Sequence, residues 1–363
     1  MKISIQRRRF LQRTAGLAAA GFVSTFPGKA LPDSSSFVAV EWGGEYIKAT
    51  KQIAAAWGKS DIDWVLVGSG AEVLAKVKAQ WPNPPFDVVA NWDPVFATMI
   101  REDWLETIAE ADIPNLKNIP EDLILKDKAG NWKTAPRSLS GSFFGYRKDT
   151  CPVQIKSIDD LLDERLKGQL VWPAPVNNGN VQMLALALHG GGNERNMEPA
   201  WEFMTKLAKS GNIGSVISGG DPEFVNAMTT GQASAGFFDA TGWSAVAENF
   251  PCKFLTKVPD QPGLKFFFFT VGWCVLKGTR HKQDVMDFIN FGLSPEMDQM
   301  MTNATKEIPT NPKASPPKGM EFMTFNPQEL KQYAYRPDWD YMSTQADAWQ
   351  KRFETEIMPL LGR

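Results

Sequence analysis

The stretch Phe86-Asp87-Val88-Val89-Ala90-Asn91-Trp92-Asp93-Pro94 contains the pattern that decides the fold class. Its first five residues are a short, mainly apolar run, which predicts a buried strand. Asp93 followed by Pro94 is a strong helix start, because aspartate caps a first turn and proline suits the first helical position. A buried strand that leads directly into a helix indicates an α/β protein with a mostly parallel sheet.

The same strand-to-helix pattern occurs twice before this stretch. Residues 37–40 form an apolar run that ends at Trp42-Gly43-Gly44, and a helical pattern follows. Residues 64–67 form another run, which Gly68-Ser69-Gly70 turns into a helix over 71–80. Strands that alternate with helices at this spacing predict one β-α-β-α lobe.

A second series of the same kind begins after Pro152. We expect strands at 170–172 and 234–238 and helices at 158–165, 181–189, 197–210 and 222–230. The aromatic run 266–276 returns to strand character, and helices are expected at 283–293, 295–303 and about 340–359. A chain of 363 residues is long enough for two lobes of ~150 residues. The expected lobes are 36–143 plus 271–318, and 144–270 plus 319–363.

Composition and charge exclude several classes of protein. Hydrophobic residues make up 43% and charged residues 22%, which is typical of a globular chain. No run reaches the ~18 apolar residues of a transmembrane helix. Residues 1–30 carry six positive charges and no acid, so the remainder has 33 basic against 41 acidic side chains. That balance excludes a nucleic-acid binder, which needs positive charge to neutralise phosphates.

The basic N-terminus has the features of an export signal. Arg7-Arg8-Arg9-Phe10-Leu11-Gln12 contains a twin arginine, and a short Ala- and Gly-rich apolar stretch follows. Gly28-Lys29-Ala30 places small residues where a signal peptidase cuts. These features resemble a twin-arginine leader, so we expect residues 1–30 to be removed and the protein to be free in the periplasm. The alternative is a basic amphipathic helix of a cytosolic protein.

Residues for metal or catalytic chemistry are scarce. The two histidines, His189 and His281, are far apart, so no metal site is expected. Three cysteines form no disulfide framework, and a bridge between Cys151 and Cys252 is left open. Without a GxSxG, HExxH or P-loop motif, and with Gly68-Ser69-Gly70 too short for a dinucleotide site, we predict a protein that is not an enzyme and has no cofactor.

Several motifs, in this order, resemble the periplasmic solute-binding proteins of ABC importers. They are the leader, the strand–Trp-Gly-Gly–helix opening, residues 86–89, Trp-Cys-Val-Leu-Lys-Gly at 273–278, Asp-Phe-Ile-Asn-Phe-Gly-Leu-Ser-Pro-Glu at 287–296 and Ile-Pro-Thr-Asn-Pro at 308–312. The spermidine/putrescine-binding type, within the polyamine, opine and phosphonate group, is the most similar branch. The resemblance implies two α/β lobes joined by crossover strands, which close on a small solute by a hinge motion. It also implies delivery of the solute to an inner-membrane permease, and we expect a monomer.

Ligands of such sheets bind beyond the carboxyl ends of strands, beside helix N-termini. The residues predicted to contact ligand there are Trp42, Gly43, Gly44, Asn91, Trp92, Asp93, Arg137, Ser138, Asn178, Asp239, Thr241 and Trp243. Each has a simpler explanation as a helix cap, a turn former or a core residue.

The charge of the ligand is the open question. The polyamine binders hold the ligand with acidic residues that this chain lacks. Where they have two acids in the second lobe, this chain has Asn178 and Val181. Where they have an aromatic residue and an acid, it has Thr270 and Gly272. Arg137 suits a carboxylate or phosphonate, which favours an anionic or zwitterionic ligand, with Trp42, Trp92 and Trp243 available to stack on an aromatic one.

Other readings of the ligand stay open. Arg137 has the alternative of a hinge salt bridge. A cation remains open through Asp93, Asp239 and Glu45. Ferric ion ranks lowest, since Tyr333 and Tyr335 lie in the C-terminal region.

Overall fold

The computed structural model describes residues 36–175, 179–218 and 220–361. The expected leader at 1–30 and the candidate Asn178 lie outside the described residues. Within the described ranges, no helix combines the length and the apolarity that crossing a membrane requires.

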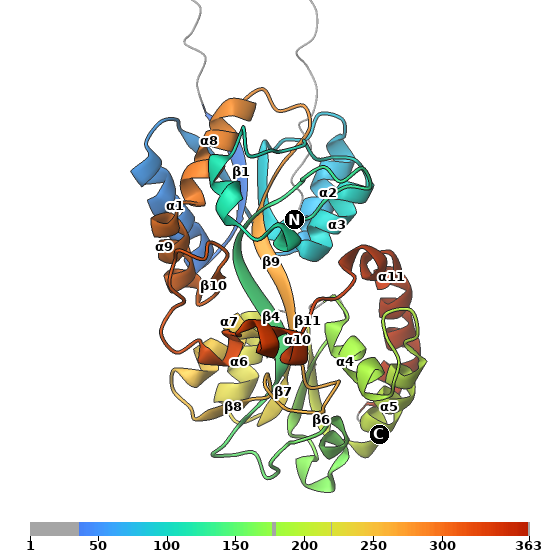
Figure 1. The fold of residues 1–363 in the computed structure, drawn as a ribbon. Coiled ribbons are helices and arrows are strands. Elements are labelled where there is room, and N and C mark those ends of the chain that lie inside the picture. Colours follow the sequence, from blue (N-terminus) through green and yellow to red (C-terminus); the bar gives the residue numbers. More distant parts are fainter. Residues whose placement is uncertain (1–35, 176–178, 219, 362–363) are drawn as a thin grey trace, which may run out of the picture. The chain divides into compact units, whose positions relative to one another are not determined.

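The first lobe has the predicted alternation of strands and helices (Figure 1). Its elements are β1 (Phe37–Trp42), α1 (Glu45–Trp57), β2 (Ile62–Val67), α2 (Gly70–Gln80), β3 (Val88–Trp92) and α3 (Asp93–Arg101). β1 pairs in parallel with both β2 and β3. The local pattern of an apolar run, a small or capping residue and an amphipathic helix therefore forms the strands and helices that the sequence predicts.

Two long strands run between the lobes. β4 (Ala135–Arg147) and β9 (Phe266–Val275) pair antiparallel from Ala135↔Trp273 to Ser142↔Phe267. β9 continues into the first lobe, where it pairs with β3, and β4 continues into the second lobe, where it pairs with β7. Figure 1 shows this ribbon passing from one group of helices to the other. We call β4 and β9 the crossover ribbon.

The second lobe repeats the α/β plan. Its elements are β5 (Leu170–Pro173), α4 (Val181–His189), α5 (Glu198–Ser210), β6 (Ile213–Ile217), α6 (Asp221–Thr229), β7 (Ala235–Asp239), α7 (Ala240–Ala247) and β8 (Cys252–Phe254). The strand order through the described sheet is β2-β1-β3-β9-β4-β7-β5-β6. The predicted helix at 158–165 is instead two short 3-10 turns, Ile158–Leu162 and Glu164–Leu166. The side chain of Ser157 caps the first turn, and the side chain of Asp163 caps the second.

The remaining helices and strands all follow β9 in the chain. They are α8 (Lys282–Gly292), α9 (Pro295–Thr305), β10 (Ile308–Pro309), α10 (Pro327–Tyr333), β11 (Ala334–Tyr335) and α11 (Trp339–Arg352). The last helix ends at Arg352 rather than near Pro359, and the chain continues as a π-helical turn and a 3-10 turn.

The C-terminal segment contacts α3 of the first lobe. Arg101 donates to the hydroxyl of Ser343 at 2.7 Å and lies 3.6 Å from the carboxylate of Asp340. The rings of Trp92 and Trp339 are 5.9 Å apart. We call residues 336–343 the clasp. It links α11, which also packs on α5 through the Arg352–Glu198 ion pair, to the first lobe.

Candidate functional site

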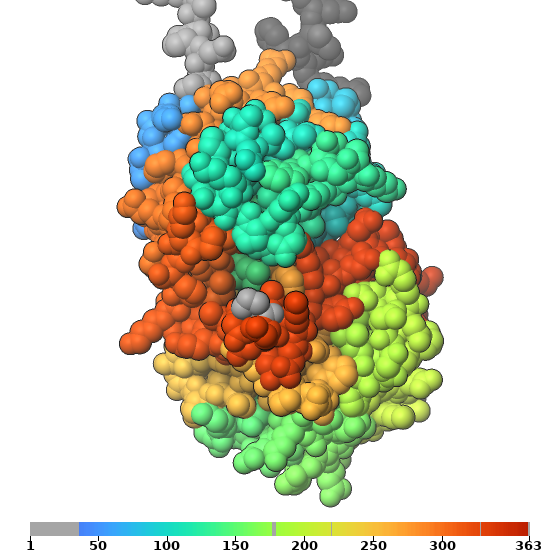
Figure 2. Space-filling model, viewed as in Figure 1, coloured from blue at the N-terminus to red at the C-terminus, as the bar shows by residue number. Residues whose placement is uncertain are grey.

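A gap lies along one edge of the crossover ribbon. β10 pairs with β4 at Ser138 and Leu139, and β7 pairs with it from Ser142 onward. Because β9 occupies the other edge of β4 over this whole stretch, β10 and β7 lie along the same edge. Leu139 and Ser142, where β10 and β7 end along β4, are three residue steps apart, about 10 Å. The gap therefore opens between the two lobes, and Figure 2 shows a hollow in which parts of β4 (green) and β9 (light orange) are visible.

Acidic side chains face each other across this gap. Glu307, directly before β10, accepts hydrogen bonds from Tyr46 at 2.6 Å, from Ser138 at 2.6 Å and from Thr305 at 3.1 Å. On the other side, Asp239 ends β7 and caps α7 by accepting from the Gly242 N–H at 2.9 Å. We call Tyr46, Asp221, Asp239 and Glu307 the acid end.

Asp221 completes the acid end. It begins α6, and its carboxyl group lies near enough to that of Asp239 for its charge to raise the pKa of Asp239. Asp221 and Asp239 are both partly exposed, whereas Glu307 is fully buried.

The pKa values at the acid end are raised, chiefly by burial and, for Asp239 and Tyr46, also by neighbouring negative charge. Burial, and then the charge of Asp221, raise the pKa of Asp239 well above its ordinary value. Burial also raises the pKa of Asp221 and of Glu307. The pKa of Tyr46 is raised by burial and by Glu307, with a contribution from Asp221 of the other lobe. Negative charge from both lobes thus converges on one place, which favours a bound cation.

The opposite edge of the ribbon has a second gap, between β3 and β11. β3 pairs with β9 from Val271 onward, and β11 pairs with it at Phe266 and Phe267. Asp93, which follows β3, accepts from the N–H of Thr270 at 3.0 Å and from its hydroxyl. Arg336 follows β11, and its guanidinium lies 3.5 Å from the same Asp93 carboxylate.

Other contacts fill this second gap. Arg336 also donates to the carbonyls of Asp122 and Leu123 and lies over the ring of Phe268. Trp92 packs edge-on against Phe269 with ring centroids 5.0 Å apart. We call Asp93, Thr270, Arg336, Trp92 and Trp339 the closed end. Its one carboxylate is already paired.

The prediction that Arg137 holds an anionic ligand is wrong. Its guanidinium makes two hydrogen bonds to Glu41, at 2.6 and 2.9 Å, and neither side chain has any exposure. Burial alone lowers the pKa of Arg137, but the charge of Glu41 outweighs it and the net direction is upward. The guanidinium also lies 4.8 Å from the ring of Trp273. The salt-bridge alternative is therefore the one that the structure contains.

The prediction that Trp243 stacks on a ligand is also wrong. Trp243 has no exposure and packs against Phe224 and Phe254, at 5.0 and 5.8 Å between ring centroids. It belongs to the core of the second lobe, because its position in α7 faces the sheet rather than the gap. The partly exposed Thr241, in the first turn of the same helix, has the more accessible position.

The other predicted residues divide between the two ends. Trp42 is partly exposed and packs edge-on against Tyr46 at 5.0 Å, which puts it beside the acid end. Gly43 and Gly44 are exposed at the start of α1, and Gly44 has a φ of 67°, which favours glycine. Asn91 is fully buried, and its side-chain Oδ1 accepts from the Trp92 N–H at 3.2 Å.

Sequence reasoning missed Tyr46, Asp221, Glu307 and Arg336. Asp221 precedes a proline, as an ordinary helix cap does, and Glu307 directly precedes the Ile-Pro-Thr-Asn-Pro motif, which by itself indicates no ligand contact. Tyr46 and Glu307 are 261 residues apart, so no local pattern connects them.

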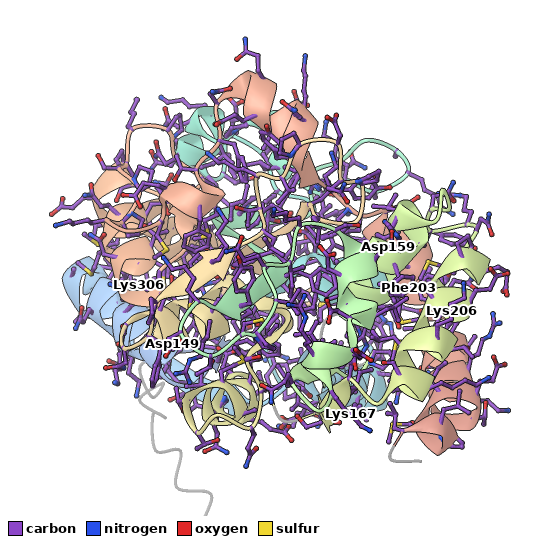
Figure 3. All side chains as sticks on the ribbon, turned by 90° about the horizontal axis from the view of Figure 1, so that it is seen from below. Asp149, Asp159, Lys167, Phe203, Lys206 and Lys306 are labelled. Atoms are coloured by element: carbon purple, nitrogen blue, oxygen red, sulfur yellow. The ribbon has the colours of Figure 1, made fainter. Side chains whose placement is uncertain are left out.

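The histidines, cysteines and tyrosines have other surroundings. His189 lies 3.1 Å from Asp159 and packs edge-on against Phe203; Figure 3 labels both neighbours. All three cysteines are free. Tyr335 donates to Glu194 at 2.9 Å. Among the described residues, no group of three or more His, Cys, Asp or Glu side chains is arranged to hold a metal ion.

Comparison with known proteins identifies the family. The profile described as "Bacterial extracellular solute-binding protein" matches residues 48–334. The chain belongs to this family. The expected recognition as a solute-binding protein is confirmed, and so are the two-lobed α/β fold and a role in binding a solute rather than in catalysis.

Solved structures share the fold of this solute-binding protein at low identity. An ABC transporter from Clostridium perfringens ATCC 13124 is 18% identical, with a TM-score of 0.71 over 88% of this chain and 99% of the other. A putative spermidine/putrescine ABC transporter from Listeria monocytogenes is 17% identical, with a TM-score of 0.71 over 89% and 99%. Iron-bound HitA from Pseudomonas aeruginosa is 15% identical, with a TM-score of 0.70 over 87% and 98%. The comparison with curated proteins gives no match.

Proposed function

We propose that this solute-binding protein captures a small organic cation and holds its ammonium group at the acid end. The observation that carries the proposal is the pair Asp221 and Asp239, two partly exposed carboxyl groups at the starts of α6 and α7, of which the charge of Asp221 raises the pKa of Asp239. An ammonium group between them offsets their repulsion. The cation replaces the anionic ligand as the favoured class, since Glu41 occupies Arg137.

The neighbouring residues have complementary roles in this proposal. Glu307 adds negative charge from the first lobe, held in place by the hydroxyls of Tyr46 and Ser138. The rings of Trp42 and Tyr46 offer faces for a cation or its methylene groups. Gly43, Gly44 and Thr241 border the site, and Asn178 stays a predicted contact.

The proposal also includes the export of the protein, its location and the delivery of its solute. We infer export through the twin-arginine leader at 1–30, residence in the periplasm as a monomer, and delivery of the solute to a permease. The lobes 36–143 plus 271–318 and 144–270 plus 319–363 close on the solute by bending of the crossover ribbon. Polyamines such as putrescine are one class of organic cation, and the fold shared with a putative spermidine/putrescine transporter supports the general class.

A thermal-shift screen of amines, amino acids and carboxylates tests the proposal. A saturating ligand stabilises by RT ln(1 + [L]/Kd), about 2.7 kcal/mol at a hundred times Kd. We expect organic cations to stabilise the wild type and Asp239→Asn to weaken their binding at least ~tenfold, the smallest effect expected for loss of a buried charge partner. Asparagine still caps α7, so the fold is preserved.

The matched control is Asp159→Asn, which removes an exposed carboxylate from the second lobe, beside His189. This variant should bind as the wild type does. A ligand set made up only of carboxylates, with equal affinity for the wild type and Asp239→Asn, would contradict the proposed function.

A further inference from the structure

We propose that the site takes a solute with positive charge at one end only, and that Arg336 rejects a second ammonium at the other end. This inference rests on the proposed function, and it goes further by separating monocations from diamines. It follows from the different states of the two gaps beside the crossover ribbon.

The two gaps lie on opposite edges of the same ribbon. The acid end lies beyond the edge of β4, between β10 and β7. The closed end lies beyond the edge of β9, between β3 and β11. From β7 across β4 and β9 to the far column of strands there are three strand spacings, about 14 Å between backbones. A linear solute held across the ribbon therefore has its two ends in two different chemical environments.

Asp93, the carboxylate of the closed end as defined above, already has partners. Asp93 has no exposure, and it accepts both the N–H and the hydroxyl of Thr270. The guanidinium of Arg336 is 3.5 Å from the same carboxylate. An ammonium group here would have to displace Arg336 or lie beside its positive charge, and both alternatives oppose binding.

Arg336 is also held firmly in this position. Besides Asp93, it is bonded to the carbonyls of Asp122 and Leu123 in the first lobe. The chain that follows it is anchored by Trp339 against Trp92 and by Arg101 against Ser343. Its side chain is nevertheless 25% exposed.

The surroundings of Arg336 suit a neutral group. The rings of Phe268, Trp92 and Trp339 all contribute to the closed end. Aromatic faces and a guanidinium donor accommodate an amide, a hydroxyl or an aromatic ring without the loss of a charge partner. The solute class is thus a monocation with a neutral, hydrogen-bond-accepting or aromatic tail.

Two probes that differ only at the far group test the inference. They are 1,7-diaminoheptane and its mono-N-acetyl derivative, which share one ammonium and the same chain. We expect calorimetry to give at least tenfold tighter binding of the acetylated probe to the wild type. In Arg336→Ala, Asp93 loses its cation and becomes a partner for the second ammonium, so diamine affinity should rise at least tenfold while the acetylated probe changes less than threefold.

The control is Arg195→Ala, which removes an exposed arginine paired with Asp338 in the clasp and leaves Asp93 untouched. It should bind both probes as the wild type does. Arg336→Met keeps the length of the side chain and should behave as Arg336→Ala does if the charge is what matters.

Each outcome has one meaning. Equal or tighter binding of the diamine to the wild type overturns the inference and leaves cation capture standing. A diamine affinity that does not rise in either Arg336 variant also overturns it. If neither probe binds, and Asp239→Asn changes the binding of no other amine, the proposed function fails and the inference fails with it.

Discussion

Arg137 on β4 and Glu41 on β1 form a fully buried, bidentate ion pair between two strands that β3 and β9 separate in the sheet. The guanidinium passes over the ring of Trp273, and the Thr50 hydroxyl donates to Glu41 at 2.7 Å. The pair therefore ties the first-lobe half of the crossover ribbon to the central strand of that lobe. Its role is structural, because Glu41 takes both hydrogen bonds of the guanidinium.

Loss of Arg137 or of Glu41 should destabilise the protein rather than change the charge of the ligands it binds. Arg137→Ala leaves Glu41 charged and buried, which we expect to reduce the free energy of unfolding by about 3–5 kcal/mol. The double variant Arg137→Met with Glu41→Leu should recover most of that loss, since no buried charge remains. Urea unfolding midpoints measure both. A stable Arg137→Ala that fails only in ligand binding would return Arg137 to the ligand site.

Asp298 should make stability depend on pH. It is fully buried in α9, accepts from the Asn311 N–H at 2.8 Å, and burial raises its pKa to about 8. A carboxyl group whose folded pKa exceeds the unfolded value of about 4 contributes stability below pH ~4 that is lost as pH rises through ~8. We expect Asp298→Asn to flatten that decline and to gain about 4 kcal/mol at pH 8.5 relative to pH 5.

Thermal unfolding from pH 5 to 8.5 measures this slope. Asp347→Asn, an exposed change on α11, is the control and should keep the wild-type slope. An unchanged slope in Asp298→Asn would mean that another group titrates in this window.

Cation affinity should fall as the pH is lowered. Burial and the charge of Asp221 raise the pKa of Asp239, and Glu307, Tyr46 and Arg137 are the other ionisable groups around the acid end. Protonated carboxyl groups do not attract an ammonium, so affinity should drop by up to ~tenfold per pH unit below the pKa. Calorimetry from pH 8 to 5 measures the drop. Asp239→Asn should flatten it, and a pH-independent affinity in the wild type would argue against an acid-held cation.

Export should depend on the paired arginines near the N-terminus. Replacement of Arg7 and Arg8 with lysine should leave the precursor in the cytoplasm, because the twin-arginine pathway reads that pair. Arg13→Lys is the matched control and should be exported normally. Fractionation followed by immunoblotting distinguishes the two locations. Undiminished periplasmic accumulation of the Arg7 and Arg8 variant would indicate another route.

Some of the candidate site was predictable, for local reasons. Trp42, Asp93 and Asp239 stand at strand ends followed by helices, and the structure has strands and helices with those boundaries. Arg137 shows the limit of that reasoning. Its place on a polar stretch of strand suggested a ligand contact, but its partner Glu41 lies 96 positions away in the chain.

The sequence by itself determined the α/β fold, the order of its strands and helices, and the family, because apolar runs, caps and glycine turns act over a few neighbouring residues. Only the tertiary structure decided which charges meet. The pairing of β4 with β9, β10 and β7 brings Glu307 opposite Asp239, and α1 brings Tyr46 beside Glu307. Coulomb and hydrogen-bond energies depend on distances in space, and distances between residues hundreds of positions apart are set by strand register rather than by local pattern.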